Sequence, residues 1–123
     1  MADISFSQYF LKSIKESKFD QIKLEDHVKS FIEWKKFNII PYIPFKVDKS
    51  SSQDDQGKVF KPYARNQYRH CHCGFKLNGD PLIVYRVLND GTIRIICVTT
   101  HDEMFNKNKR DNFIKKYNNE FPR

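Results

Sequence analysis

The sequence predicts an α+β fold in which a helical hairpin packs on a small antiparallel β-sheet, with a C-terminal helical extension. The first observation is a pair of apolar runs, 82–88 and 92–98, on either side of Asn89-Asp90-Gly91. An Asp-Gly pair between β-branched runs is typical of a β-hairpin, because glycine adopts a positive φ without steric cost. The second is helical spacing of apolar residues in two stretches over 7–37, and the third is a closing helical segment over 102–117. We therefore expect the α+β class, with the helices grouped on one face of an antiparallel sheet.

Both runs of the hairpin are rich in Ile and Val and are apolar on both faces. We therefore expect the hairpin at the centre of the sheet, with helices covering it. In an antiparallel pair the start of one strand lies beside the end of its partner. Asp80 precedes the first run and His101 follows the second, so we expect these two residues on the same rim of the sheet.

A short strand over 2–5 and a first helix are predicted at the beginning of the chain. Apolar residues recur at every fourth position from Phe6 to Ile14, which gives the helix one apolar stripe. Ser5 or Ser7 is expected to cap its start, because a serine hydroxyl accepts a hydrogen bond from the first helical N–H groups.

A second helix is predicted over 20–37, with Pro41 and Pro44 ending it. His27 and Trp34 lie in this helix and are interpreted as packing or surface residues. The two helices are expected to form a hairpin on the sheet. The buried face of the second helix is predicted from its apolar stripe as Leu24, Val28, Phe31 and Ile32.

The middle of the chain is expected to contain a loop and then a strand. Residues 46–58 are polar and include three consecutive serines, which indicates a surface loop. Neither flank is large enough to fold alone, so 1–123 is read as one domain. A strand is predicted over 67–75. Alternation along it places Tyr68, His70 and His72 on one face and Arg69, Cys71 and Cys73 on the other.

Composition limits the class of protein and its partners. The chain has 123 residues, which suits one domain with a modest core. No apolar run is long enough to span a membrane, and the N-terminus does not resemble a secretory signal. Three cysteines do not suggest a disulfide framework, so a reducing, cytoplasmic location is expected. The net charge of +7 favours a polyanionic partner: nucleic acid, an anionic membrane surface or an acidic protein. The membrane is disfavoured by the lack of a long basic amphipathic helix.

The run His70-Cys71-His72-Cys73 raises the question of a metal site. On a strand the two histidines face away from the two cysteines, so the four side chains cannot surround one ion. We expect no bound metal or other cofactor and interpret Cys71 and Cys73 as small core residues. One alternative remains open, in which His101 joins the two histidines in a catalytic zinc site with three histidine ligands.

Metal-free acid–base chemistry is the second hypothesis. His70, His72, Asp80 and His101 are expected to converge on one rim. RNA cleavage needs a base for the 2′-hydroxyl proton, an acid for the leaving 5′-oxygen and a cation for the phosphorane charge. Histidine suits both proton roles because its ordinary pKa lies near 7. Phe105 is suited to stack on a base. The nearby cations are Lys61, Arg69, Arg86 and Arg94.

The alternative to catalysis is a basic module that binds nucleic acid, in which these polar residues are ordinary surface groups. Basic residues interleaved with aromatics over 63–69 would serve such a module.

Three segments occur in a characteristic order: Arg69-His70-Cys71-His72, the run from Asp80 to Arg86, and Thr100-His101-Asp102-Glu103-Met104-Phe105. Together they resemble the RelE/ParE superfamily of bacterial toxins, and most closely the YafQ-type mRNA interferases. The opening, ISFSQYFLKSIK, is similar to that family's first strand and helix. The resemblance is best over 59–105.

The resemblance implies a site. His72 and His101 take the places of catalytic histidines, and Asp80 that of a catalytic aspartate. His70 stands where the family has a second aspartate, and Lys61 is the nearest counterpart of an upstream histidine. The implied catalytic set is His70, His72, Asp80 and His101, and the implied substrate-binding set is Lys61, Arg69, Arg86 and Phe105.

The resemblance also implies an activity. It predicts a RelE-like toxin of a type II toxin–antitoxin system, which cleaves mRNA on the ribosome without a metal and is neutralised by an antitoxin protein. Residues 76–79 look inserted, and 106–123 extend past the usual end of the family. The rival hypotheses are a ParE-like toxin that acts on gyrase by binding, a nucleic-acid-binding module, and the three-histidine metal hydrolase.

Overall fold

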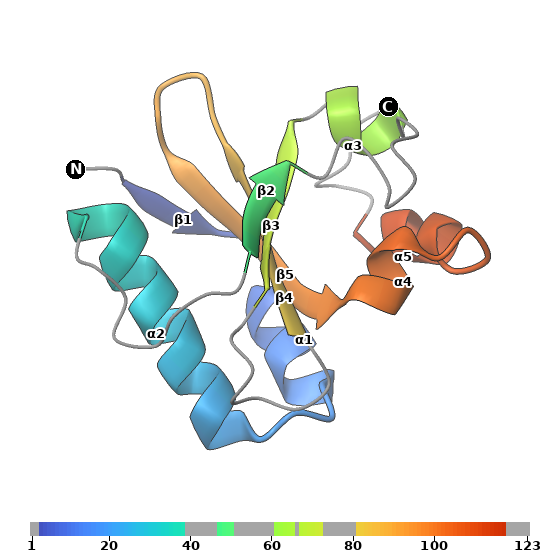
Figure 1. The fold of residues 1–123 in the computed structure, drawn as a ribbon, viewed down its shortest axis with the longest axis horizontal. Helices are drawn as coiled ribbons and strands as arrows, with labels where there is room; N and C mark the ends of the chain where they lie inside the picture. Colours follow the sequence, from blue (N-terminus) through green and yellow to red (C-terminus); the bar gives the residue numbers. More distant parts are fainter. Residues whose placement is uncertain (1–2, 39–46, 51–60, 66, 73–80, 118–123) are drawn as a thin grey trace.

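The computed structural model describes residues 3–38, 47–50, 61–65, 67–72 and 81–117 (Figure 1). Within these ranges, ten helices and strands follow one another. In order they are β1 (Ile4–Phe6), α1 (Phe10–Glu16), α2 (Gln21–Phe37), β2 (Val47–Ser50), α3 (Lys61–Arg65), β3 (Tyr68–His72), β4 (Pro81–Val87), β5 (Ile93–Thr100), α4 (His101–Phe105) and α5 (Arg110–Lys116).

The strands form one five-stranded sheet in the order β1-β5-β4-β3-β2. The predicted α+β class is confirmed, but the sheet is mixed, because β1 runs parallel to β5 while the other neighbours are antiparallel. The prediction of a loop over 46–58 is wrong for Val47–Ser50, which pair with Arg69–His72 as strand β2. The other residues of that segment lie outside the described residues.

The β4–β5 hairpin confirms the strongest local prediction. Gly91 adopts φ +88° in the turn, and its N–H donates to Leu88 O at 2.9 Å. The Asp90 carboxylate accepts from Thr92 N at 2.9 Å and pins the same turn. The hairpin lies at the centre of the sheet, as expected from its two apolar faces.

A register shift follows further along the hairpin. Val84 lies opposite Cys97 and Tyr85 opposite Ile95, so Ile96 is an extra residue in β5. Because of this bulge, Ile96 and its neighbour Cys97 both pack in the same core cluster.

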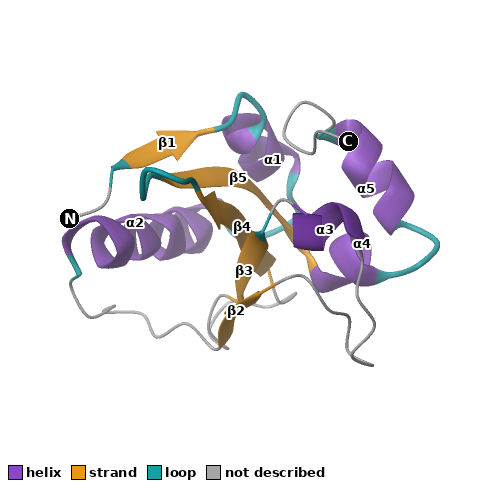
Figure 2. Ribbon diagram, turned by 90° about the horizontal axis from the view of Figure 1, so that it is seen from above, coloured by secondary structure: helices purple, strands orange, loops and turns teal. Residues whose placement is uncertain are grey.

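Helices α1 and α2 form the predicted hairpin and cover one face of the sheet (Figures 1 and 2). Asp20 caps α2 by accepting from Lys23 N at 3.1 Å. Asn38 ends the helix with a left-handed φ of 56°, before the prolines that were expected to end it. This core cluster contains Phe10, Ile14, Leu24, Val28, Phe31, Cys71, Ile83, Tyr85, Ile93, Ile95 and Val98.

Two serines of the α1 region form hydrogen bonds with backbone groups on the open edge of β5. Strand β1 pairs only with Ile93–Ile95. Beyond it, the Ser7 hydroxyl donates to Ile96 O, and the Ser13 hydroxyl accepts from Val98 N at 3.0 Å. The expectation that Ser5 or Ser7 caps α1 is therefore wrong: Tyr9 is the N-cap residue, and Ser7 is used to complete the sheet edge instead.

The opposite face of the sheet is covered by α3, α4 and α5 (Figure 2). The expectation that all helices group on one face is thus wrong. The single helix predicted over 102–117 is two helices, because Thr100 caps α4 and the chain turns at Asn106. The cluster on this face contains Tyr63, Tyr68, Leu82, Val84, Ile96, Cys97, Met104, Phe113, Ile114 and Tyr117. None of the helices in the described ranges is long and apolar enough to cross a membrane.

Candidate catalytic site

Three histidines from two elements meet at one rim of the sheet. His70 and His72 point to the same face of β3 because strand side chains alternate. His101 is the first residue of α4, directly after β5. The ring centroids lie 5.3 Å apart for His70 and His72, 5.7 Å for His72 and His101, and 6.5 Å for His70 and His101. The predicted convergence of these three residues is confirmed.

Phe105 completes the group from the last residue of α4. It lies one helical turn after His101, and their ring centroids are 4.6 Å apart. Its ring is also 4.9 Å from that of His70 and 6.0 Å from that of Tyr63. Phe105 is half-buried, so it both packs against the site and presents an aromatic edge to the solvent.

Burial separates the three histidines into two kinds. His70 is 0 % exposed, whereas His72 and His101 are partly exposed. His70 is enclosed because it sits opposite Val84 in the sheet and against Phe105 of α4. His70 is therefore not accessible to a substrate in this conformation, and its place in the implied catalytic set stays a prediction. Its buried ring instead packs against the accessible imidazoles of His72 and His101.

Arg69 does not belong to this group. Its position between Tyr68 and His70 turns it to the other face of β3. There its Nε donates to the hydroxyl of Tyr85 at 3.2 Å, beside the core formed with α2. In this conformation the sheet separates Arg69 from His72 and His101, and its expected role in substrate binding stays a prediction.

Arg86 shares a face with the histidines but lies at the far end of the strands. It pairs with Tyr68, and its guanidinium carbon is 5.6 Å from the centre of the Tyr68 ring. Four residues of strand separate Tyr68 from His72, or about 13 Å. Arg94, its partner on β5, donates to Ser5 Oγ and to Phe6 O, both at 3.3 Å. Neither arginine reaches the rim in this conformation.

Lys61 is a predicted substrate-binding cation whose helix, α3, packs beside the histidine site. It is exposed at the start of α3. That helix is fastened to α4 by Tyr63, whose hydroxyl donates to Met104 O at 2.6 Å. Burial raises the pKa of Tyr63, so its hydroxyl keeps the proton that it donates. Lys61 therefore belongs to the helix that borders Phe105.

Two predicted residues, Asp80 and Cys73, lie outside the described residues. The neighbour of Asp80, Pro81, pairs with Thr100, the residue before His101. The role of Asp80 stays a prediction. Cys71 is buried in the core beside α1 and α2, which confirms its interpretation as a core residue.

The carboxylates of α4 were missed by the sequence reasoning. Glu103 Oε2 accepts from Thr99 Oγ1 at 3.0 Å, and Glu103 N donates to Thr100 Oγ1 at 3.2 Å. The neighbouring Asp102 binds Lys109, and hydrogen bonds from Lys109 and Asn106 lower the pKa of its carboxyl. The Thr-x-x-Glu spacing from Thr100 is a helix-start signal that would have placed the beginning of α4 at His101.

Among the residues that the structure describes, no three His, Cys, Asp or Glu side chains are arranged to hold one metal ion. The three-histidine zinc site is therefore not supported by the arrangement of His70, His72 and His101. The site contains two accessible imidazoles, those of His72 and His101, beside the buried imidazole of His70.

No protein-family model and no curated protein matches the sequence. A match was found among solved structures, in the crystal structure of a metal-bound toxin from Helicobacter pylori. The two chains superpose with a TM-score of 0.52 at 22% sequence identity, over 85% of this chain and all of the other. At that identity the likeness is one of fold: the chain shares the α+β fold of that protein.

Proposed function

We propose that this protein is the toxin of a type II toxin–antitoxin system and that it cleaves mRNA on the ribosome. The observation that carries the proposal is the pair of accessible histidines, His72 and His101, 5.7 Å apart on a fold like that of a bacterial toxin. Two groups that can each give or take a proton are the minimum that this cleavage needs.

The proposed reaction is a transesterification. One of the two imidazoles removes the proton of a 2′-hydroxyl, and the resulting oxygen attacks the adjacent phosphorus. The bond from phosphorus to the 5′-oxygen breaks, and the other imidazole protonates that oxygen. The products are a 2′,3′-cyclic phosphate and a 5′-hydroxyl. DNA lacks the attacking group, so it is not a substrate.

The neighbouring residues receive supporting roles in this proposal. Phe105 stacks against a nucleobase and holds His101 in place through their ring contact. Lys61 supplies positive charge to the phosphate from the start of α3. Asp80 orients one imidazole. His70 supports the other histidines from below, as a positioning residue.

The net charge of the chain supports RNA as the substrate. A net charge of +7 attracts a polyanion such as RNA and raises its concentration near the protein. The Helicobacter pylori toxin was crystallised in a metal-bound form. In this chain we assign the proton transfers to His72 and His101, because their imidazoles are accessible and their ring centroids lie 5.7 Å apart.

Primer extension on a defined mRNA in a translating bacterial extract tests the activity. We expect new cuts that require an intact start codon, because cleavage depends on the ribosome. The downstream fragments should carry a 5′-hydroxyl, which polynucleotide kinase labels without prior phosphatase treatment.

Cuts that persist on mRNA without a start codon would contradict ribosome dependence. The absence of any cut by the folded protein would favour a toxin that acts by binding alone, like the ParE subgroup.

A further inference from the structure

Two arginines lie directly opposite each other in the β4–β5 hairpin, on the histidine face of the sheet but at the end remote from the rim. Arg86 of β4 pairs with Arg94 of β5, and the same row continues to Tyr68 of β3 and to Ser5 of β1. Side chains directly opposite in antiparallel strands share one face, with Cβ atoms about 4.5–5.5 Å apart. Two positive charges are therefore held side by side on this face.

The two arginines are held in place in different ways. Arg94 donates to Ser5 Oγ and to Phe6 O, both at 3.3 Å. The guanidinium carbon of Arg86 lies 5.6 Å from the centre of the Tyr68 ring. A guanidinium that lies over an aromatic ring uses its face for that contact, while its N–H donors lie in its plane. Both arginines are half-buried, so their positions are set before a ligand binds.

Arg86 carries a charge that its surroundings do not balance. It forms no ion pair within the described part of the chain, and its Nε is buried there without a hydrogen-bond partner. Buried N–H groups are nearly always paired, and like charges directly opposite each other destabilise a sheet. The pair therefore destabilises the free protein, and a bound anion would remove that penalty.

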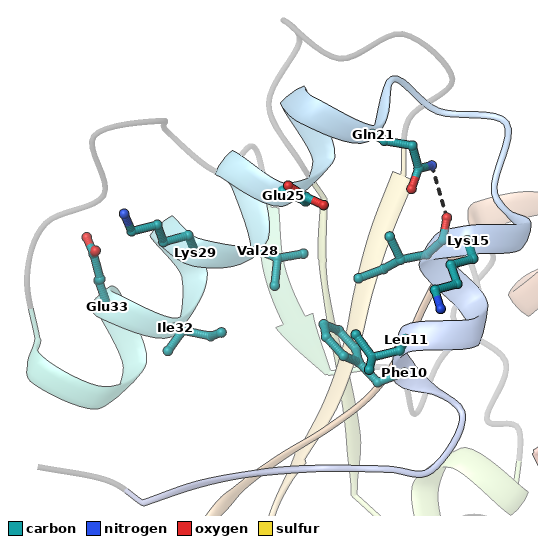
Figure 3. Close-up of a pocket in the computed structure, with 10 residues that line it drawn as sticks. Phe10, Leu11, Lys15, Gln21, Glu25, Val28, Lys29, Ile32 and Glu33 are labelled. Carbon is teal, nitrogen blue, oxygen red and sulfur yellow. Dashed lines mark hydrogen bonds between the residues drawn. The ribbon is translucent and has the colours of Figure 1, made fainter.

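Charges on the opposite face of the sheet are arranged differently. The groove between α1 and α2 is lined by Lys15 and Lys29 together with Glu25 and Glu33 (Figure 3). The positive and negative charges of that groove balance one another. Arg86 has no such acid beside it among the described residues. The arginine pair therefore differs from the mixed charge of the groove, and it favours a negatively charged ligand.

We propose that Arg86 and Arg94 form a second site, which binds a phosphate group of single-stranded RNA away from the bond that is cleaved. Planar guanidinium groups bind phosphate through paired N–H donors, and two of them side by side offer donors to several oxygens of one phosphate. Binding of phosphate by the pair stands by itself, whereas its use for mRNA rests on the proposed function.

Helix α3 connects this arginine site with the histidine rim. The ring of Tyr63 lies 6.5 Å from that of Tyr68, which contacts Arg86, and 6.0 Å from that of Phe105, which contacts His101. Along β3 the two ends are about 13 Å apart. An RNA strand that runs along α3 therefore places different nucleotides in the two sites, and the arginines hold the strand while the histidines act on it.

Urea unfolding in inorganic phosphate tests the anion site. A ligand that binds only the folded protein raises its stability. We expect the urea midpoint of wild type to be higher in phosphate than in sodium chloride of equal ionic strength, and we expect Arg86→Gln to lose most of that rise. Lys36→Gln is the matched control, because it removes one positive charge at an exposed position near the end of α2. A general effect of phosphate on stability would appear equally in both variants.

Binding of RNA distinguishes a nucleic-acid strand from a free phosphate ion. The probe is a short fluorescein-labelled single-stranded RNA, and the measurement is fluorescence anisotropy over a range of salt concentrations. We expect Arg86→Gln and Arg94→Gln each to weaken binding several-fold. Each should also reduce the slope of log affinity against log salt concentration by about 0.7, because one phosphate contact is lost. Lys36→Gln should stay close to wild type in both quantities.

Equal RNA affinity of wild type and both arginine variants would overturn the proposal. An equal loss in Lys36→Gln would do the same, because net charge alone would then explain the binding. A phosphate-dependent rise of the midpoint that Arg86→Gln loses, together with unchanged RNA affinity, would mean that the site takes a free phosphate group, and it would overturn the assignment to RNA.

Both measurements are made without ribosomes, so they do not depend on cleavage. His101→Ala should keep the phosphate-dependent rise of the midpoint, because His101 lies at the other end of the sheet. A failure of the cleavage assay alone would therefore contradict the proposed function and leave the arginine site intact. Loss of phosphate and RNA binding in the arginine variants alone leaves the assignment of the histidines unchanged.

Discussion

The role of a single residue on this sheet depends on the face that its side chain occupies. His70, His72 and Arg69 are adjacent on one strand, yet only His72 combines the right face with access to solvent. The alternation of a strand was enough to predict which histidines converge. It was not enough to predict that His70 is enclosed, because Phe105 of α4, which lies 35 positions later in the sequence, provides the cover.

His27 shows the same dependence on burial, with a consequence for stability. It is 2 % exposed in α2, and burial lowers its pKa while the charge of Asp26 partly offsets that effect. The folded protein therefore keeps His27 neutral at a pH where the unfolded chain already binds a proton. As the pH falls through the ordinary range near 6.5, the free energy of unfolding decreases.

We predict that His27→Gln reduces this loss of stability. The measurement is urea unfolding at pH 7.5 and pH 5.5 for both proteins. The drop in unfolding free energy between the two pH values should be smaller for the variant, because its side chain does not titrate. The same drop in both proteins would mean that other groups, and not His27, carry the pH dependence.

The helices and strands of the fold differ in how far their own residues determine them. The β4–β5 hairpin and α2 were predictable because their signals lie within them: a glycine in the turn and an aspartate at the cap. Strand β2 was missed because a polar segment becomes a strand only through its pairing with β3. Helix α3 was missed because it is short and is held by distant partners.

Tyr63 is the residue that holds α3 against the site. The last carbonyl groups of a helix lack partners within it, and the Tyr63 hydroxyl satisfies that of Met104 in α4. We predict that Tyr63→Phe lowers the free energy of unfolding by about 1–3 kcal/mol, because a buried carbonyl loses its donor. Chemical denaturation measures the change.

Tyr9→Phe is the control for this substitution. The Tyr9 ring packs on Tyr117 at 5.3 Å, and its hydroxyl makes no hydrogen bond within the described part of the chain. Its stability should stay close to that of wild type. Equal losses in both variants would show that the bond between Tyr63 and Met104 contributes nothing specific.

Different helices cover the two faces of the sheet. One face, covered by α3, α4 and α5, carries the histidines, and the other is covered by the α1–α2 hairpin. The sequence predicted the fold class and the converging histidines, because the hairpin and its rim are encoded locally. It did not predict that helices cover both faces, because the cover of the second face comes from Tyr63, Met104 and Phe113, which meet there only in the folded chain.

The measurement that tests the central claim most directly is the cleavage rate of His72→Ala and His101→Ala beside wild type. It uses the primer-extension assay on the same mRNA. Each variant should first show the wild-type circular dichroism spectrum, and Lys107→Ala, an exposed position two residues after Phe105, serves as the surface control.

We predict that the control cuts at the wild-type rate and that each histidine variant is slower by about 10²–10⁴-fold, the usual loss when a general acid or base is removed. Full activity in both folded variants would contradict the account, since the accessible histidines would then take no part in the chemistry.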